Sequence, residues 1–151
     1  MAIYLGLGTN LGDREMNLVT ARDLLMKHDV LVVGQSEVRE TEPLGGLDQP
    51  MYLNQVIEVH TDLEPEKLLL ACKLVEQEMG RENVEMPRAG NVSFGPPKKK
   101  GPEDWKSRLI DIDILSYHDL ILESPALVLP HPGNEERDFV LEGIADLEGA
   151  G

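Results

Sequence analysis

Two aspartates, Asp111 and Asp113, stand two positions apart in a stretch made mostly of isoleucine and leucine. Ile110, Ile112 and Ile114 alternate with them, and this period of two predicts a β-strand with one apolar face and one carboxylate face. On such a strand the two carboxylates lie about 6–7 Å apart. Mg²⁺ is typically held by one or two carboxylates, with phosphate oxygens completing its shell. Metal-assisted phosphate chemistry is therefore one interpretation, and a plain amphipathic strand with outward aspartates is the other.

Positive charge gathers just before this strand, in a chain that is otherwise acidic. The net charge is −14, and seven of the 14 basic residues lie between Arg81 and Arg108. A nucleic-acid backbone is bound through many Lys and Arg contacts, so the overall charge argues against nucleic-acid binding. A basic segment beside paired aspartates favours a local polyanion site, although a solvated charged loop has the same composition. Arg108 begins the strand, at a position suited to a phosphate contact.

The composition is that of one globular domain covering residues 1–151. The chain is 41% hydrophobic and 28% charged, and no apolar run approaches the roughly 18–20 residues of a membrane span. The single cysteine, Cys72, excludes an intrachain disulfide framework and is expected to be a buried thiol. The N-terminus lacks the basic region of a signal peptide. We therefore expect a cytoplasmic protein that binds no membrane.

The elements that must position the aspartates follow from periodicity and turn residues. Segments bounded by turn residues predict strands at 2–8, 30–41, 52–61, 108–115 and 126–129. Helical spacing predicts helices at about 13–28, 65–80 and 137–147. Asp13 is the expected N-cap of the first, and the second is expected to begin with Pro65 in its first turn and to end at Gly80. Residues 81–106 carry several prolines and glycines without a period, which predicts a long mobile loop of the kind that often serves as a lid. The order β-α-β-β-α-β predicts an α+β, ferredoxin-like sandwich with helices on one face of an antiparallel sheet, plus a C-terminal helix.

Six short motifs stand in one order along nearly the whole chain. They are Leu7-Gly8-Thr9-Asn10-Leu11-Gly12, Pro43-Leu44-Gly45, Asp48-Gln49-Pro50-x-Tyr52-Leu53-Asn54, Glu76-x-x-x-Gly80-Arg81, Trp105-x-x-Arg108-x-x-Asp111-x-Asp113, and Pro130-His131 with Arg137-x-Phe139. Together they resemble the 6-hydroxymethyl-7,8-dihydropterin pyrophosphokinases of folate biosynthesis. The resemblance implies an ATP-dependent diphosphotransferase that moves pyrophosphate from ATP to the pterin hydroxymethyl group and releases AMP.

The resemblance also implies roles for individual residues. Two Mg²⁺ ions would be held by Asp111 and Asp113, with Asp113 also placed to take the hydroxyl proton. The catalytic set would be Asp111, Asp113, Arg81 and Arg108. ATP would be bound by Glu76, Arg81, Trp105, Arg108, His131 and Arg137. The pterin would be bound by Pro43, Leu44, Gly45, Tyr52, Asn54 and Phe139, with Tyr52 and Phe139 stacking on its ring.

Two other functions fit part of the sequence. Another Mg²⁺-dependent phosphotransferase or nucleotidyltransferase would use Asp111 and Asp113 without needing Tyr52, Asn54 and Phe139 as a pterin pocket. A regulatory ferredoxin-like module that binds small ligands would need no chemistry, and it would leave the clustering of aspartates and arginines unexplained. We expect a monomer that binds ATP and the pterin.

Overall fold

The computed structural model describes residues 2–42, 51–80, 109–134 and 137–149. A four-strand antiparallel path runs in the order β2-β4-β1-β5, and the short strand β3 pairs with β4. The strands of this sheet are β1 (Ile3–Thr9), β2 (Leu31–Gln35), β3 (Arg39–Thr41), β4 (Tyr52–His60) and β5 (Asp111–Tyr117). The helices are α1 (Arg14–Lys27), α2 (Pro65–Glu78) and α3 (Asp138–Gly149). This strand order and connectivity confirm the ferredoxin-like prediction.

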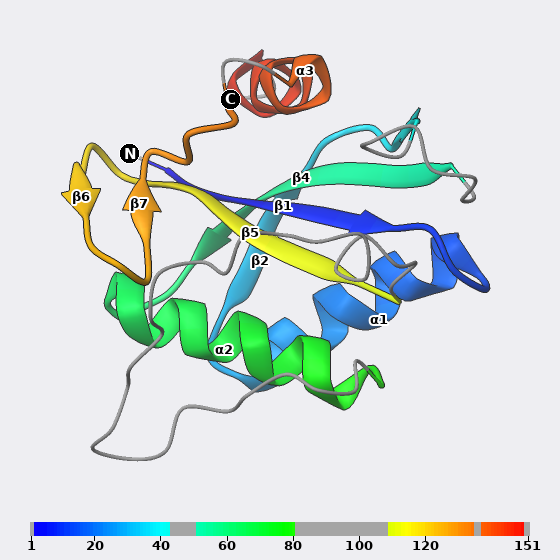
Figure 1. Ribbon diagram of the computed structural model, residues 1–151, viewed down its shortest axis with the longest axis horizontal. Coiled ribbons are helices and arrows are strands. Elements are labelled where there is room, and N and C mark those ends of the chain that lie inside the picture. Colours follow the sequence, from blue (N-terminus) through cyan, green and yellow to red (C-terminus); the bar gives the residue numbers. More distant parts are fainter. Residues whose placement is uncertain (1, 43–50, 81–108, 135–136, 150–151) are drawn as a thin grey trace.

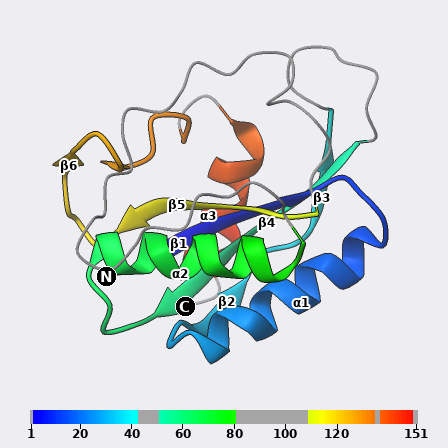
Figure 2. The same cartoon turned by 60° about the horizontal axis from the view of Figure 1, so that its bottom comes forward.

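Helices cover the two faces of the sheet unequally. Figure 1 shows α1 and α2 together on one side, and α3 alone on the other. Figure 2, turned by 60°, shows the same separation, with α1 and α2 in front of the sheet. The prediction of helices on one face plus a C-terminal helix is therefore confirmed. Among the described helices, α3 is the one that packs on this second face of the sheet (Figure 1).

The main core lies between the sheet and the pair α1 and α2. It takes the inward residues of β1, namely Ile3, Leu5 and Leu7, together with apolar residues of both helices. Cys72 belongs to this core, as predicted, and burial raises the pKa of its thiol. A smaller cluster on the opposite face joins α3 to the sheet, and its buried members are Val56, Leu115, Val140 and Leu147. The alternation of β-strand side chains therefore feeds two cores, one on each face.

Local signals set several element ends where the sequence predicts them. Asp13 caps α1 by accepting a hydrogen bond from the Met16 backbone N–H at 3.1 Å. Pro65 occupies the first turn of α2, and Gly80 follows that helix with φ of +94°, a conformation that favours glycine. The expected short strand near 126–129 is β7 (Val128–Leu129), paired with β6 (Leu122–Glu123). The expected loop at 81–106 lies outside the residues that the structure describes.

One predicted strand is wrong in its extent. The single strand expected at 30–41 is divided into β2 and β3, with Ser36 between them. The Ser36 hydroxyl accepts a hydrogen bond from the Val56 backbone N–H at 2.9 Å, while the Ser36 N–H donates to the Val56 carbonyl at 2.8 Å. A side-chain oxygen thus takes the place of a backbone carbonyl in the ladder, and the regular pairing with β4 stops.

Candidate active site

Asp111 and Asp113 lie on the face of β5 that turns away from α1 and α2. Ile110, Ile112 and Ile114 are at most 2% exposed and belong to the main core. The two aspartates alternate with them, are half-buried, and occupy the opposite face. The predicted division into an isoleucine face and a carboxylate face is confirmed.

A β-bulge interrupts β5 just beyond the aspartates. Tyr4 of β1 pairs with Ser116 and Leu5 pairs with Ile114, so Leu115 has no partner across the ladder. Leu115 packs in the smaller core beneath α3, and its carbonyl accepts hydrogen bonds from the His131 N–H at 2.9 Å and the Asn134 side-chain amide at 2.8 Å. Bulges often re-aim backbone groups beside functional sites. Here the bulge attaches the turn after Pro130 to the aspartate strand.

His131 and Arg137 are brought together beside Asp113. The Gly133 N–H donates to His131 Nδ1 at 3.0 Å, which makes Nδ1 an acceptor and leaves the proton of the neutral ring on Nε2. Arg137 Nη2 lies 3.4 Å from the same Nδ1, and Arg137 Nη1 lies 3.8 Å from Asp113 Oδ2. The guanidinium carbon also stands 5.4 Å from the centroid of the Phe139 ring. Four residues predicted separately from the sequence thus form one cluster.

The predicted pterin residues of β4 lie on the same face, across β1 from the aspartates. Gly8 pairs with Asn54 on one side and with Asp111 on the other. A Cβ atom on Gly8 would come within 3.3 Å of Asn54 Oδ1 and 3.7 Å of Tyr52 Cδ1. Asn54 Oδ1 and the Tyr52 ring therefore lie over Gly8, and the absence of a side chain there lets both come close to β1.

Asn54 is held in place by β3. Its Nδ2 donates to Thr41 Oγ1 at 2.5 Å and lies 3.5 Å from the Arg39 carbonyl. Because the amide nitrogen is committed to β3, the oxygen is the end that faces Gly8. Arg39 also bonds to α3, through Glu142 at 2.8 Å and Asp146 at 2.9 Å. The sequence gives no signal of this contact, because an isolated arginine among acidic residues does not indicate a partner on a distant helix.

Glu76, predicted as an ATP-side residue, is only 1% exposed. Its Oε2 accepts a hydrogen bond from the Ile112 N–H at 2.8 Å, and its Oε1 lies 3.6 Å from Lys73 Nζ. The structure thus gives Glu76 a supporting contact behind the aspartate strand, and its ATP contact stays a prediction. The remaining predicted site residues, Pro43, Leu44, Gly45, Arg81, Trp105 and Arg108, lie outside the described parts of the chain.

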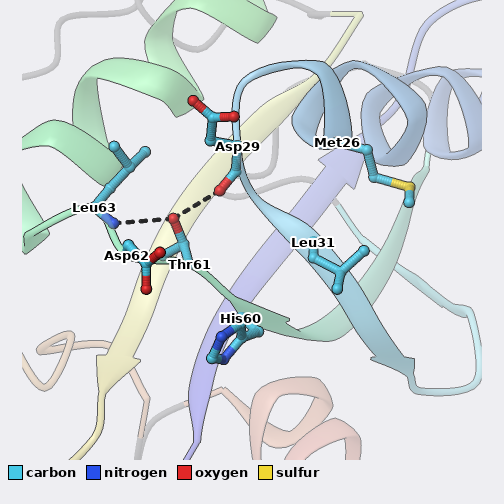
Figure 3. Close-up of a pocket in the computed structure, with 7 residues that line it drawn as sticks. All are labelled: Met26, Asp29, Leu31, His60, Thr61, Asp62 and Leu63. Carbon is cyan, nitrogen blue, oxygen red and sulfur yellow. Dashed lines mark hydrogen bonds between the residues drawn. The ribbon is translucent and has the colours of Figure 1, made fainter.

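A separate surface pocket lies at the far end of β4, away from Tyr52 and Asn54. It measures about 440 Å³ and is lined by Met26, Asp29, Leu31, His60, Thr61, Asp62 and Leu63. Figure 3 shows Thr61 there, with its hydroxyl between the Asp29 carbonyl and the Leu63 N–H. The predicted site residues that the structure describes lie elsewhere. No helix within the described ranges is long and apolar enough to cross a membrane.

Comparisons with known proteins agree with this geometry. A profile of the family described as 7,8-dihydro-6-hydroxymethylpterin-pyrophosphokinase matches residues 4–149. The 2-amino-4-hydroxy-6-hydroxymethyldihydropteridine pyrophosphokinase of Bacillus subtilis is 36% identical over 145 residues, covering 95% of this chain and 76% of the relative. The enzyme of the same name from Aquifex aeolicus is 35% identical over 147 residues, covering 97% of this chain and 79% of the relative.

Longer proteins match as well. The folic acid synthesis protein fol1 of Schizosaccharomyces pombe is 39% identical over 145 residues, which cover 95% of this chain but 17% of that protein. This chain therefore spans less than a fifth of fol1. The family match favours the pyrophosphokinase reading over another phosphotransferase and over a regulatory module. On the extent of that match and the identity with relatives of similar length, the chain belongs to the 7,8-dihydro-6-hydroxymethylpterin-pyrophosphokinase family.

Proposed function

We propose that this chain, a pyrophosphokinase by family, transfers pyrophosphate from ATP to 6-hydroxymethyl-7,8-dihydropterin and releases AMP, as a step of folate biosynthesis. The observation that carries the proposal is the row Asn54–Gly8–Asp111 across three neighbouring strands. It sets an amide suited to a pterin edge and a carboxylate suited to a metal–phosphate group on one face, separated by a residue without a side chain. A pterin bound beside Asn54 and Tyr52 would thus present its hydroxymethyl group toward the aspartates.

Asp111 and Asp113 fit a magnesium site completed by substrate. The described part of the chain contains no group of three or more His, Cys, Asp and Glu residues arranged to hold a metal. Two carboxylates are nevertheless the usual protein share of a Mg²⁺ site, because phosphate oxygens and water supply the other ligands. We assign two Mg²⁺ ions to this pair. When bound, they would neutralise phosphate charge and lower the barrier to attack by the hydroxyl.

His131 and Arg137 supply the positive and hydrogen-bonding side of the proposed ATP site. The Gly133 N–H bond to Nδ1 fixes the tautomer, so Nε2–H is the donor that His131 offers to a phosphate. Arg137 lies between this ring and Asp113, where a phosphate held near the aspartate would be within its reach. Asp113 is the proposed acceptor of the hydroxyl proton. Arg81, Arg108 and Trp105 complete the ATP site by resemblance to the family.

Asn54, Tyr52 and Phe139 form the proposed pterin site with Pro43, Leu44 and Gly45. The pterin ring carries an amide-like edge, and Asn54 Oδ1, which lies over Gly8, would accept a hydrogen bond from a ring N–H. Tyr52 and Phe139 would stack on the ring from β4 and from α3. We further propose a cytoplasmic monomer that binds no nucleic acid, which the net charge of −14 supports.

The test is AMP release from ATP and Mg²⁺, with and without 6-hydroxymethyl-7,8-dihydropterin. Wild type should release AMP only with the pterin, and Asp113→Ala should lose this activity while remaining folded. Asp119→Ala, which removes an exposed carboxylate from the turn just after β5, is the matched control and should behave as wild type. AMP or ADP formed without the pterin would contradict the proposed acceptor. Full activity in Asp113→Ala would contradict the proposed metal site.

A further inference from the structure

The turn that carries His131 is fastened to β5 by two hydrogen bonds to one atom. The Leu115 carbonyl accepts from the His131 N–H at 2.9 Å and from Asn134 Nδ2 at 2.8 Å. The Asn134 N–H also donates to the His131 carbonyl at 3.1 Å, which closes the turn on itself. A single backbone bond would let the turn pivot about Leu115. The second bond, from the Asn134 side chain, fixes its orientation.

That orientation decides where the positive charge of the site lies. Arg137 Nε is 3.4 Å from the Gly133 carbonyl, and Arg137 Nη2 is 3.4 Å from His131 Nδ1, so the guanidinium rests on the turn through two contacts. Its Nη1 then lies 3.8 Å from Asp113 Oδ2. Leu115 is two residues beyond Asp113 on the same strand. The path from the aspartate to the arginine therefore runs through Leu115, Asn134 and the turn.

The amide of Asn134 is not explained by stability alone. Its Oδ1 is buried and has no hydrogen-bond partner in the structure as described, and an unsatisfied buried acceptor is unfavourable. The orientation of the amide is nevertheless determined, because only Nδ2 can donate to the Leu115 carbonyl. Asn134 thus keeps its bond to β5 although its own Oδ1 stays unsatisfied, which lowers stability locally.

We propose that Asn134 is a positioning residue for ATP. It holds the turn that places His131 and Arg137 beside Asp113. The inference rests on the proposed function, because it requires Arg137 to contact the phosphates. Asn134 acts through the turn rather than by touching ATP. Its loss should therefore weaken ATP use and leave Tyr52 and Asn54, the pterin residues of β4, unchanged.

The experiment is a double-mutant cycle on the full chain, read as the KM for ATP, the KM for the pterin, kcat and the thermal midpoint. Asn134→Ala should raise the KM for ATP about fivefold, the equivalent of one neutral hydrogen bond, with the KM for the pterin unchanged. Arg137→Ala should raise the KM for ATP further. The double variant should match Arg137→Ala alone, because residues acting through one another are not additive. Asn134→His, which keeps a ring N–H in place of Nδ2, should recover most of the loss.

Thr61→Val is the matched control for a lost side-chain bond to a backbone carbonyl. Thr61 donates to the Asp29 carbonyl at 2.8 Å at the opposite end of β4 (Figure 3), so its change should lower the thermal midpoint without altering either KM. If Asn134→Ala does not fold, Asn134→Ser takes its place in the cycle, because its shorter side chain draws the donor away from Leu115.

The outcomes separate two failures. An unchanged KM for ATP in Arg137→Ala would contradict the proposed ATP site itself. If Arg137→Ala raises the KM for ATP, three results would overturn the positioning role alone. Asn134→Ala could leave the KM for ATP unchanged, or it could raise the KM for both substrates equally. The third result is a double variant whose KM for ATP shows the sum of the two single effects.

Discussion

Glu76 Oε2 on α2 accepts a hydrogen bond from the Ile112 backbone N–H at 2.8 Å. Ile112 lies between Asp111 and Asp113 on β5, the edge strand of the sheet, and its N–H bonds to α2 rather than to a strand. A buried carboxylate thus satisfies the open edge of the strand at the point where the two aspartates are presented. A helix on one face of the sheet thereby fixes the backbone of the site on the other.

Removing the Glu76 acceptor should destabilise the fold and displace the aspartates. Glu76→Ala leaves the Ile112 N–H buried without a partner, so we expect the free energy of unfolding to fall by about 1–3 kcal/mol and kcat to fall as well. Glu76→Gln retains an oxygen acceptor and should lose less of both. Urea denaturation and AMP release measure the two effects. A Glu76→Gln variant of normal stability that loses ATP affinity would favour a direct ATP contact over a supporting one.

A side chain at Gly8 should impair pterin binding selectively, because it would press on Asn54 and Tyr52. A Cβ there already comes within 3.3 Å of Asn54 Oδ1, and overpacking of this kind typically costs about 1–3 kcal/mol. We expect Gly8→Ala to raise the KM for the pterin, Gly8→Val to raise it at least about tenfold, and neither to change the KM for ATP. Steady-state kinetics with each substrate varied in turn provide the test. An equal rise for both substrates would show that Gly8 does not separate the two sites.

The close approach of α3 to the sheet should make Gly143 intolerant of a side chain. A Cβ on Gly143 would overlap Val56 Cγ2. Alanine gains about 1 kcal/mol of helix propensity over glycine, but the overlap forces α3 off the sheet, so we expect a net loss of about 1–2 kcal/mol. Urea denaturation of Gly143→Ala is the measurement, with Leu141→Ala, an exposed position on the same helix, as control. A stabilised Gly143→Ala variant would contradict the packing of α3 on β4.

The attachment of α3 to β3 should depend on pH through Asp146. The hydrogen bond and charge of Arg39, followed by a hydrogen bond from the Glu37 N–H, hold the pKa of Asp146 below its ordinary value of 3.8. A carboxylate with a lowered folded pKa contributes stability above its unfolded pKa and loses it as the pH falls through the folded value. Asp146→Asn should therefore be less stable than wild type at pH 7.

The difference between Asp146→Asn and wild type should shrink as the pH falls below 3.8, because Asp146 then becomes protonated in the wild type. Urea midpoints measured between acidic and neutral pH test this. Glu148→Gln, which removes one negative charge from the same helix, controls for a general effect of net charge. A difference that stays constant with pH would mean that the Arg39 bond does not contribute through ionised Asp146.

Local patterns in the sequence were sufficient for most of the elements, though not for the division into β2 and β3, and for the orientation of the aspartates. A period of two placed Ile112 inward and Asp113 outward, because successive side chains of a strand point to opposite faces of the sheet. The cap at Asp13 and the proline at Pro65 marked where helices begin, since both act within one turn. The motifs quoted from the chain also indicated the family, which the comparisons confirm.

Contacts between distant segments decided what local patterns could not. Glu76 has an ionisable side chain on a helix, so its burial depends on the Ile112 N–H, which belongs to a strand 36 positions later. The bulge at Leu115 arises from pairing with β1, and the Leu115 carbonyl at this bulge is the group to which the Asn134 side chain donates. The sequence alone determined which groups could do phosphate chemistry and on which face of a strand they stand. The tertiary structure decided that Arg137 meets Asp113, because only packing brings the turn before α3 beside β5.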